Sequence, residues 1–242
     1  MRSVAPMNVT NSPVFETRDL CRSYWQGSVK VDALSGVNMT VSAGQFLVIA
    51  GTSGSGKSTL LHLLGGLDRP DAGAVFFDGT DLASLTEAQR TAIRRRRLGF
   101  VFQSFNLVPV LSAYENVEYG LWLDGVPKSE RRRRVEDALE AVGLADRMSH
   151  RPDHLSGGQR QRVALARALV HEPAAVLADE PTASLDSLTG RAMVALLTEL
   201  NERRRTTFVF ATHDPAIIAR SPRVIYLTDG KVVEGPRGDA GR

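Results

Sequence analysis

Three short stretches of the chain are apolar at almost every position. They are FLVIAG at 46–51, AAVLAD at 174–179 and TFVFAT at 207–212. An apolar run without alternation is typical of a strand that is buried on both faces of a sheet. Each run is followed by sequence that is compatible with a helix, and this alternation predicts an α/β fold with a mostly parallel sheet.

Two Asp-Gly pairs predict antiparallel hairpins. Asp78-Gly79 lies beside the β-rich run AVFF, and Asp229-Gly230 lies beside VIYL. Asp-Gly is favoured in two-residue hairpin turns because both turn residues need a positive φ. We expect both hairpins to be attached to the parallel sheet.

A long segment without a buried strand predicts a helical lobe. From Pro109 to about Leu155 no continuous apolar run occurs, and ERRRRVEDALEAVGL instead has apolar residues at the spacing i, i+3, i+4 and i+7. These apolar residues are Val135, Ala138, Leu139 and Val142. The spacing indicates an amphipathic helix that ends near Gly143. We expect the helical lobe to cover about 109–170 and to be inserted between core strands.

Length and composition indicate one globular domain. The 242 residues are 43% hydrophobic and 24% charged, which is sufficient for a full core over 13–235. The ends, 1–12 and 236–242, are polar and rich in glycine or proline, and we expect them to be mobile extensions.

The chain lacks the signals of secretion and of membrane insertion. Cys21 is the single cysteine, which excludes a disulfide framework or a multi-cysteine zinc site and suits a reducing compartment. No stretch approaches the roughly 18 apolar residues that a bilayer span requires, and the N-terminus has no apolar signal region. We therefore expect a cytoplasmic protein; at a membrane, another chain would supply the spanning part.

Arginine occurs in three runs, at 94–97, 131–134 and 203–205, although the net charge is only +3. We interpret the runs as solvated helix faces, because Arg132 with Glu136 and Arg133 with Asp137 have the i,i+4 spacing of helical ion pairs. Contact with anionic lipid headgroups or with a membrane partner is the alternative.

The segment GTSGSGKST fits the phosphate-loop pattern G-x-x-x-x-G-K-[ST]. It lies after a predicted buried strand and before the apolar helix LLHLLGGL, as the mechanism requires. Glycines let backbone amides converge on phosphates, Lys57 can bridge β- and γ-phosphate oxygens, and Ser58 can ligate Mg²⁺. The predicted nucleotide-binding residues of this loop are Gly51, Ser53, Gly54, Ser55, Gly56, Lys57, Ser58 and Thr59.

Polar residues at the ends of other predicted strands complete a hydrolytic site. Asp179 ends the run AAVLAD and is the candidate for the Mg²⁺ shell, and Glu180 is the candidate base for the attacking water. Gln103 ends LGFVF and could contact Mg²⁺ and this water, while His213 follows TFVFAT and could donate to the γ-phosphate. Ligands of α/β proteins bind at this edge of the sheet.

The stretch DHLSGGQRQRVALARAL places two glycines in the first turn of a predicted helix. Ser156 and Gln159 have the spacing of a capping box, but glycine in a helix costs roughly 1 kcal/mol relative to alanine. Uncovered amides at a helix start favour anions. An ordinary capped helix start is one interpretation, and a second phosphate-contacting site at Ser156, Gly157, Gly158 and Gln159 is the sharper alternative.

With the phosphate loop, Gln103, LSGGQ, LADEP and His213 in this order, the chain resembles the ATP-binding subunits of ABC transporters over about Val14 to Gly235. The resemblance implies a P-loop ATPase core with an antiparallel β lobe and a helical signature lobe, using ATP and Mg²⁺. It implies two partners, a separately encoded polytopic permease and a second copy or a similar subunit, whose ATP LSGGQ would cover. The protein would then be peripheral on the inner face of the membrane.

The resemblance also assigns softer positions. It places Tyr24 against adenine, with Trp25 as an alternative, and Asp186 in the loop that crosses the dimer interface. Softer motifs are most like those of lipoprotein-releasing and macrolide- or peptide-exporting systems, with the cell-division ATPase close by. Thr52 and Gly120 stand where proline is frequent, and TASLDS departs from the usual Gly-Asn before Leu-Asp.

Three classes of function share these motifs. A DNA-repair or chromosome ATPase would need a long coiled coil or a zinc module between the phosphate loop and LSGGQ, and a translation-type ATPase joins two cassettes. The chain has neither feature. We therefore favour the energising subunit of a membrane transporter, with a cell-division signalling ATPase as the alternative and no specific nucleic acid as partner.

Overall fold

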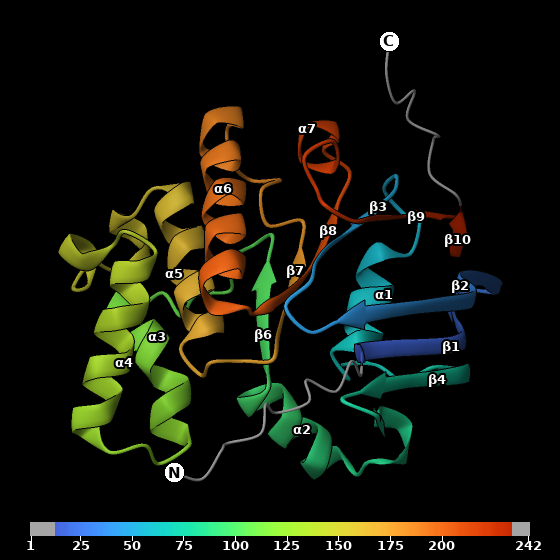
Figure 1. Ribbon diagram of the computed structural model, residues 1–242, viewed down its shortest axis with the longest axis horizontal. Helices are drawn as coiled ribbons and strands as arrows, with labels where there is room; N and C mark the ends of the chain where they lie inside the picture. Colours follow the sequence, from blue (N-terminus) through green and yellow to red (C-terminus); the bar gives the residue numbers. More distant parts are fainter. Residues whose placement is uncertain (1–12, 234–242) are drawn as a thin grey trace, which may run out of the picture.

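The computed structural model describes residues 13–233, and the expected mobile ends, 1–12 and 236–242, lie outside the described residues. Two sheets and a group of helices lie side by side (Figure 1). Within 13–233, no helix is long and apolar enough to cross a membrane.

The central sheet has six strands in the order β10-β9-β3-β8-β7-β6. All neighbouring strands are parallel except the β9–β10 pair, which confirms the mostly parallel α/β core. Every residue of the β3 and β8 runs is buried, as expected for strands covered on both faces. The strands are β3 Phe46–Ala50, β6 Leu98–Phe102, β7 Ala175–Asp179, β8 Thr207–Thr212, β9 Val224–Thr228 and β10 Lys231–Val233.

A second sheet is antiparallel, in the order β2-β1-β4-β5. Its strands are β1 Pro13–Gln26, β2 Val29–Ser42, β4 Ala72–Phe77 and β5 Thr80–Asp81. The Asp229-Gly230 hairpin joins the central sheet as expected, but the Asp78-Gly79 hairpin does not, so that expectation is wrong. Strand β4 pairs with β1, and the rings of Phe15 and Phe77 pack 5.3 Å apart. The turn residues specify a hairpin but do not specify which sheet it joins.

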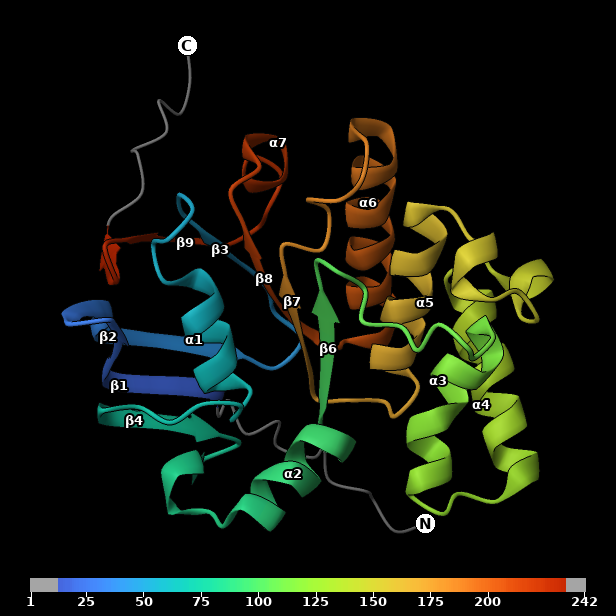
Figure 2. The same cartoon turned by 180° about the vertical axis from the view of Figure 1, so that it is seen from behind.

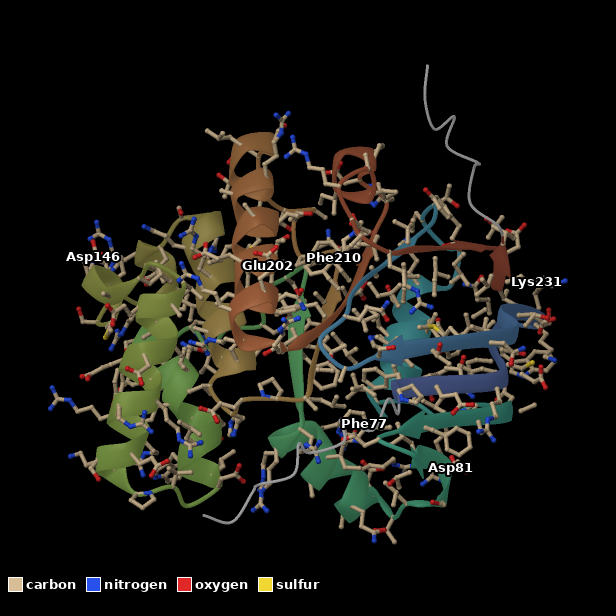
Figure 3. The ribbon with its side chains drawn as sticks, in the orientation of Figure 1. Phe77, Asp81, Asp146, Glu202, Phe210 and Lys231 are labelled. Atoms are coloured by element: carbon tan, nitrogen blue, oxygen red, sulfur yellow. The ribbon has the colours of Figure 1, made fainter. Side chains whose placement is uncertain are left out.

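Helix α1, Lys57–Leu64, lies between the two sheets (Figures 1 and 2). Its four leucines are buried in a cluster with residues of β1, β2, β4 and one face of the central sheet. The other face packs against α5, α6 and the helical lobe. In Figure 3, Phe210 lies in the central sheet and Phe77 at the second sheet, while Lys231 and Asp146 mark opposite sides of the molecule. The core between the two sheets thus holds α1 at the edge of the central sheet.

The segment between β6 and β7 contains no strand, and its helices lie within the expected 109–170. The predicted amphipathic helix is α4, whose Val135, Ala138 and Leu139 are buried, and Gly143 follows it with φ of 70°. The predicted ion pairs of Arg132 and Arg133 both form. The α-helices of this segment are α3 Ala113–Leu123, α4 Lys128–Ala141 and α5 Gly157–Leu169. Outside it lie α2 Glu87–Arg96, α6 Ser187–Arg204 and α7 Pro215–Ile218.

Candidate nucleotide-binding site

The predicted site residues lie where four parallel strands end. The phosphate loop follows β3, Gln103 follows β6, Glu180 follows β7 and His213 follows β8. All four strands run in the same direction, so these ends meet at one edge of the sheet. A cavity of about 550 Å³ opens there, and its lining includes Ser53, Gly54, Gly56, Lys57, Ser58, Thr59, Gln103, Glu180 and His213.

Glycines shape the phosphate loop. Gly56 is the N-cap of α1 with φ of 104°, and a Cβ there would lie 2.3 Å from the carbonyl oxygen of Ala33. A Cβ on Gly51 would lie 2.3 Å from the carbonyl oxygen of Leu227, and Ser55, within the same loop, is buried. No side chain caps the start of α1, which leaves the first-turn amides to a bound anion.

The ammonium of Lys57 is a buried positive charge in this loop, and 6% of the side chain is exposed. Its Nζ donates to the carbonyl oxygens of Gly51 and Thr52, both at 2.9 Å. It also lies 3.6 Å from Oε1 of Glu180. Two carbonyl oxygens and one carboxylate oxygen therefore surround the ammonium. Phosphate oxygens can accept hydrogen bonds from it in the same way.

Ser58 and Asp179 place two hard oxygen ligands side by side. Ser58 Oγ donates to Asp179 Oδ1 at 3.1 Å. No cluster of three or more His, Cys, Asp or Glu side chains within 13–233 could hold a metal ion by itself. Magnesium commonly takes one or two protein oxygens and completes its shell with phosphate and water. The Ser58–Asp179 pair fits such a site.

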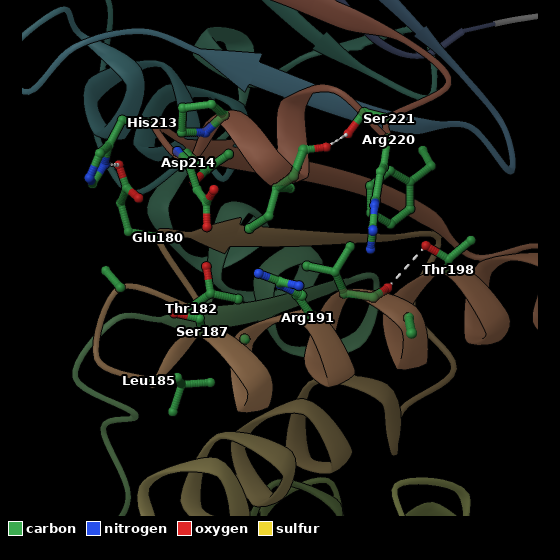
Figure 4. Close-up of a pocket in the computed structure, with 18 of the residues that line it drawn as sticks. Glu180, Thr182, Leu185, Ser187, Arg191, Thr198, His213, Asp214, Arg220 and Ser221 are labelled. Carbon is green, nitrogen blue, oxygen red and sulfur yellow. Dashed lines mark hydrogen bonds and ion pairs between the residues drawn. The ribbon is translucent and has the colours of Figure 1, made fainter.

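Glu180 is fixed in an unusual backbone conformation. Its φ is 45°, in the left-handed region that non-glycine residues rarely adopt, and its amide donates to the carbonyl of Ala211 at 3.0 Å. Glu180 Oε1 lies 2.9 Å from Nδ1 of His213, where the ring nitrogen donates because a carboxylate only accepts (Figure 4). This geometry aims the carboxylate at the cavity and leaves the His213 side chain 62% exposed.

The loop that carries Gln103 is held by a residue that the sequence did not single out. Phe105 and Asn106 both have positive φ, and Arg167 of α5 donates to their carbonyl oxygens at 2.8 and 2.6 Å. Burial lowers the pKa of this guanidinium. Ser184 Oγ additionally donates to the carbonyl of Gln103 at 3.3 Å. Arg167, the single charged residue in the apolar stretch VALARAL, was the signal for this contact.

The LSGGQ segment forms the predicted capping box but does not line the cavity of its own phosphate loop. Ser156 Oγ accepts from the amide of Gln159, and Gln159 Oε1 accepts from the amide of Ser156. A Cβ on Gly158 would lie 2.4 Å from Cγ2 of Thr189 in α6, so packing within the chain accounts for this glycine. A Cβ on Gly157 would lie 3.5 Å from its nearest neighbour, in Leu185, so Gly157 has no such reason.

Asp186 caps the start of α6, beside a second cavity of about 770 Å³. The Asp186 carboxylate accepts from the amides of Leu188 and Thr189 and from Thr189 Oγ1, and these hydrogen bonds lower its pKa. Figure 4 shows the second cavity between α6 and the chain after β8, with Glu180 and His213 at one end. Glu180 and His213 line both cavities, so the cavity along α6 adjoins that of the phosphate loop.

Tyr24 does not line the phosphate-loop cavity. Its hydroxyl donates to Asp68 Oδ2 at 2.8 Å, and the guanidinium of Arg22 lies 4.8 Å from its ring centroid. Trp25, the alternative aromatic residue, is 71% exposed. Stacking of either ring on adenine stays a prediction.

The structure has a strand, a glycine-rich loop and a helix at the end of a parallel sheet, with Lys57, Ser58, Asp179 and Glu180 beside them. This arrangement is that of the P-loop nucleoside triphosphatase fold. A family model described as ABC transporter matches residues 34–183. The chain therefore belongs to the ABC transporter family, as an ATP-binding subunit.

Individual relatives agree with this assignment. The lipoprotein-releasing system ATP-binding protein LolD of Alcanivorax borkumensis is 47% identical over 220 residues, which are 91% of this chain and 96% of that protein. The pyoverdine export ATP-binding/permease protein PvdT of Pseudomonas aeruginosa is 45% identical over 94% of this chain and 34% of its own length. A dimeric post-hydrolysis structure of the cassette MJ0796 bound to ADP and Pi matches with a TM-score of 0.83 and 42% identity, covering 91% of this chain and 97% of that one.

Proposed function

We propose that the chain binds ATP with Mg²⁺ and hydrolyses it to power a separate membrane subunit of the exporter or lipoprotein-release type. The observation that carries the proposal is that Lys57, Ser58, Glu180 and His213 line one cavity, where Ser58 donates to Asp179. The names of LolD and PvdT support the type of transporter. On this proposal, the protein is cytoplasmic and peripheral on the inner face of the membrane.

Each residue has a distinct task in the proposed reaction. Lys57 would move from the loop carbonyls to phosphate oxygens, and Ser58 with Asp179 would hold Mg²⁺, which supplies charge neutralisation at the phosphates when bound. Glu180 would accept the proton of the attacking water. His213 would donate toward the phosphate, and Gln103 would orient the water from the end of β6.

LSGGQ requires a second chain in this proposal. Ser156, Gly157, Gly158 and Gln159 do not line the phosphate-loop cavity of their own chain, yet Ser156 and the start of α5 form an anion-favouring helix end. We propose that they cover the ATP of a second copy or of a similar subunit. The dimeric form of the related MJ0796 cassette supports pairing. A separately encoded polytopic permease would then follow the opening and closing of the pair.

Replacing Glu180 tests the hydrolytic site. Glu180→Gln keeps the size of the side chain and removes its basicity, so we expect ATP binding to persist, turnover to fall at least about 100-fold and a dimer to accumulate with ATP. Glu172→Gln is the matched control, because Glu172 is also a glutamate with left-handed φ, at 53°, and does not line the cavity. Normal steady-state turnover in Glu180→Gln would reject Glu180 as the base.

The partner is tested by purifying the protein from detergent-solubilised membranes and identifying the accompanying chain by mass spectrometry. A polytopic membrane protein is the expected result. Recovery with ribosomes or nucleic acid alone would reject the transporter assignment.

A further inference from the structure

Gln161 is a fully buried amide in α5, with 0% of the residue exposed. Its Nε2 donates to the carbonyl oxygen of Pro181 at 2.6 Å and lies 3.5 Å from the carbonyl oxygen of Phe102. Both neighbours accept hydrogen bonds, so the NH₂ end of the amide must face them. Its Oε1 is buried and has no hydrogen-bond partner within the described part of the chain. Leaving such an atom unpaired costs about 1–3 kcal/mol, so packing alone is a poor reason for a glutamine here.

The two acceptors flank predicted catalytic residues. Phe102 directly precedes Gln103, and Pro181 directly follows Glu180. Because proline has no N–H, the carbonyl is the only backbone hydrogen-bonding group of Pro181, and Gln161 donates to it. One NH₂ group therefore reaches the chain beside both residues that are proposed to act on the attacking water.

Helix α5 links this contact to the LSGGQ segment. Gln161 lies four residues after Gly157, which is about one helical turn from the end of α5 that is proposed to cover the partner's ATP. At the same end of α5, Gly158 packs against Thr189 of α6. Helix α5 would contact the ATP of the partner chain, and it is hydrogen-bonded to the two loops whose residues would hydrolyse the ATP of its own chain.

We infer that Gln161 is a positioning residue: its amide holds the loops of Gln103 and Glu180 in register with α5, so that the geometry for hydrolysis in one chain depends on that chain's own signature helix. The inference rests on the proposed function. A misplacement of about 1 Å can reduce turnover roughly 100-fold, so loss of this hydrogen bond is expected to lower kcat and to leave ATP affinity unchanged.

Gln161→Met tests the inference, because methionine has a similar length and no donor. We expect kcat to fall at least about tenfold while the Kd of the monomer for a fluorescent ATP analogue stays within about twofold. The matched control is Asn116→Leu, which removes another buried amide, 2% exposed, whose donations within the described residues go to the carbonyls of Val108, Leu111 and Ser112. An unchanged kcat in Gln161→Met, or an equal loss of kcat in Asn116→Leu at an equal loss of melting temperature, would overturn the inference. If Gln161→Met does not fold, Gln161→Asn serves instead, since its amide is one methylene too short.

Mixed pairs locate the effect. When one chain carries Gln161→Met and the other carries Glu180→Gln, turnover relies on Glu180 of the Gln161→Met chain, and we expect it to be lost. When one chain carries both substitutions and the other is wild type, turnover relies on the wild-type Glu180, and we expect it to be retained. Turnover that is retained in the first pair and lost in the second would overturn the inference. It would mean that Gln161 serves only the contact of LSGGQ with the partner's ATP. If the wild-type chain itself neither pairs nor hydrolyses ATP, the proposed function fails instead.

Discussion

Gly157 and Gly158 are adjacent in the first turn of α5, and we predict opposite effects on stability when each is replaced by alanine. Neither has a positive φ, so alanine fits the backbone at both positions and gains up to about 1 kcal/mol in helix propensity. At Gly157 the nearest atom to a new Cβ is 3.5 Å away, which is an ordinary contact. Gly157→Ala should therefore stabilise the isolated chain by roughly 0.5–1 kcal/mol.

At Gly158 the new Cβ would meet Cγ2 of Thr189 at 2.4 Å. Threonine is branched at Cβ and cannot swing this methyl group away easily, and its Oγ1 is held by Asp186 at 2.6 Å. Overpacking of this kind costs about 1–3 kcal/mol, which exceeds the gain in propensity. Gly158→Ala should therefore destabilise the chain by up to about 2 kcal/mol. Its free energy of unfolding should be about 1–3 kcal/mol lower than that of Gly157→Ala.

Urea unfolding of the monomer measures both effects, and Thr189→Ser isolates their cause. Serine keeps the hydroxyl that Asp186 accepts from and removes only the methyl group. A double-mutant cycle of Gly158→Ala with Thr189→Ser should therefore recover a coupling energy of about 1–3 kcal/mol. Equal unfolding midpoints for the two alanine variants, or a coupling energy near zero, would refute the packing argument. ATP-dependent pairing provides a separate readout, because Gly157→Ala should impair it without loss of monomer stability if Gly157 approaches the partner's nucleotide.

Three further predictions follow from contacts of single residues. Lys57→Met should lower ATP affinity at least about tenfold by calorimetry, because it removes the cation of the phosphate loop; unchanged affinity would contradict the assignment. Tyr24→Ala should weaken ATP binding more than Trp25→Ala does, and the opposite order would move the adenine contact to Trp25. Burial lowers the pKa of His171, a stronger effect than the attraction of Asp124, which raises it. The unfolded chain therefore binds a proton more readily, and stability should be full above pH of about 6.5 and fall as the pH decreases below it. His171→Gln should flatten this dependence in urea midpoints, and parallel curves for wild type and variant would exclude His171 as its source.

Features set by local pattern were predictable from the sequence. The continuous apolar runs predicted β3, β7 and β8, the helical spacing around Leu139 predicted α4, and the phosphate-loop pattern predicted the glycine-shaped turn before α1. Because parallel strands end at one edge, the common location of Gln103, Glu180 and His213 was also predictable. In each case the responsible residues are close together in sequence or are constrained by the direction of a strand.

Features set by contacts between distant segments were not predictable. The Asp78-Gly79 turn does not specify that β4 will pair with β1, and nothing near Gly158 indicates that Thr189 will occupy the space of its missing side chain. The hydroxyl of Tyr24 likewise donates to Asp68, a residue 44 positions away. Such partners are selected by the packing of whole elements, on which a single sequence gives little information.

Helix α5 shows that one kind of distant contact does leave a local sign. Gly158, Gln161, Leu165 and Ala168 follow one another at helical spacing, and all four are buried, so Gln161 occupies a position where an apolar residue is expected. Arg167, on the same helix, donates to the loop after Gln103. A polar side chain on a buried helix stripe must find hydrogen-bond acceptors, and here the acceptors are carbonyl groups of the loops at the ends of β6 and β7. Gln161 and Arg167 interrupt the apolar sequence of α5 and connect it to the proposed catalytic loops. A break of this kind in a sequence therefore identifies a residue whose partner must be sought elsewhere in the chain.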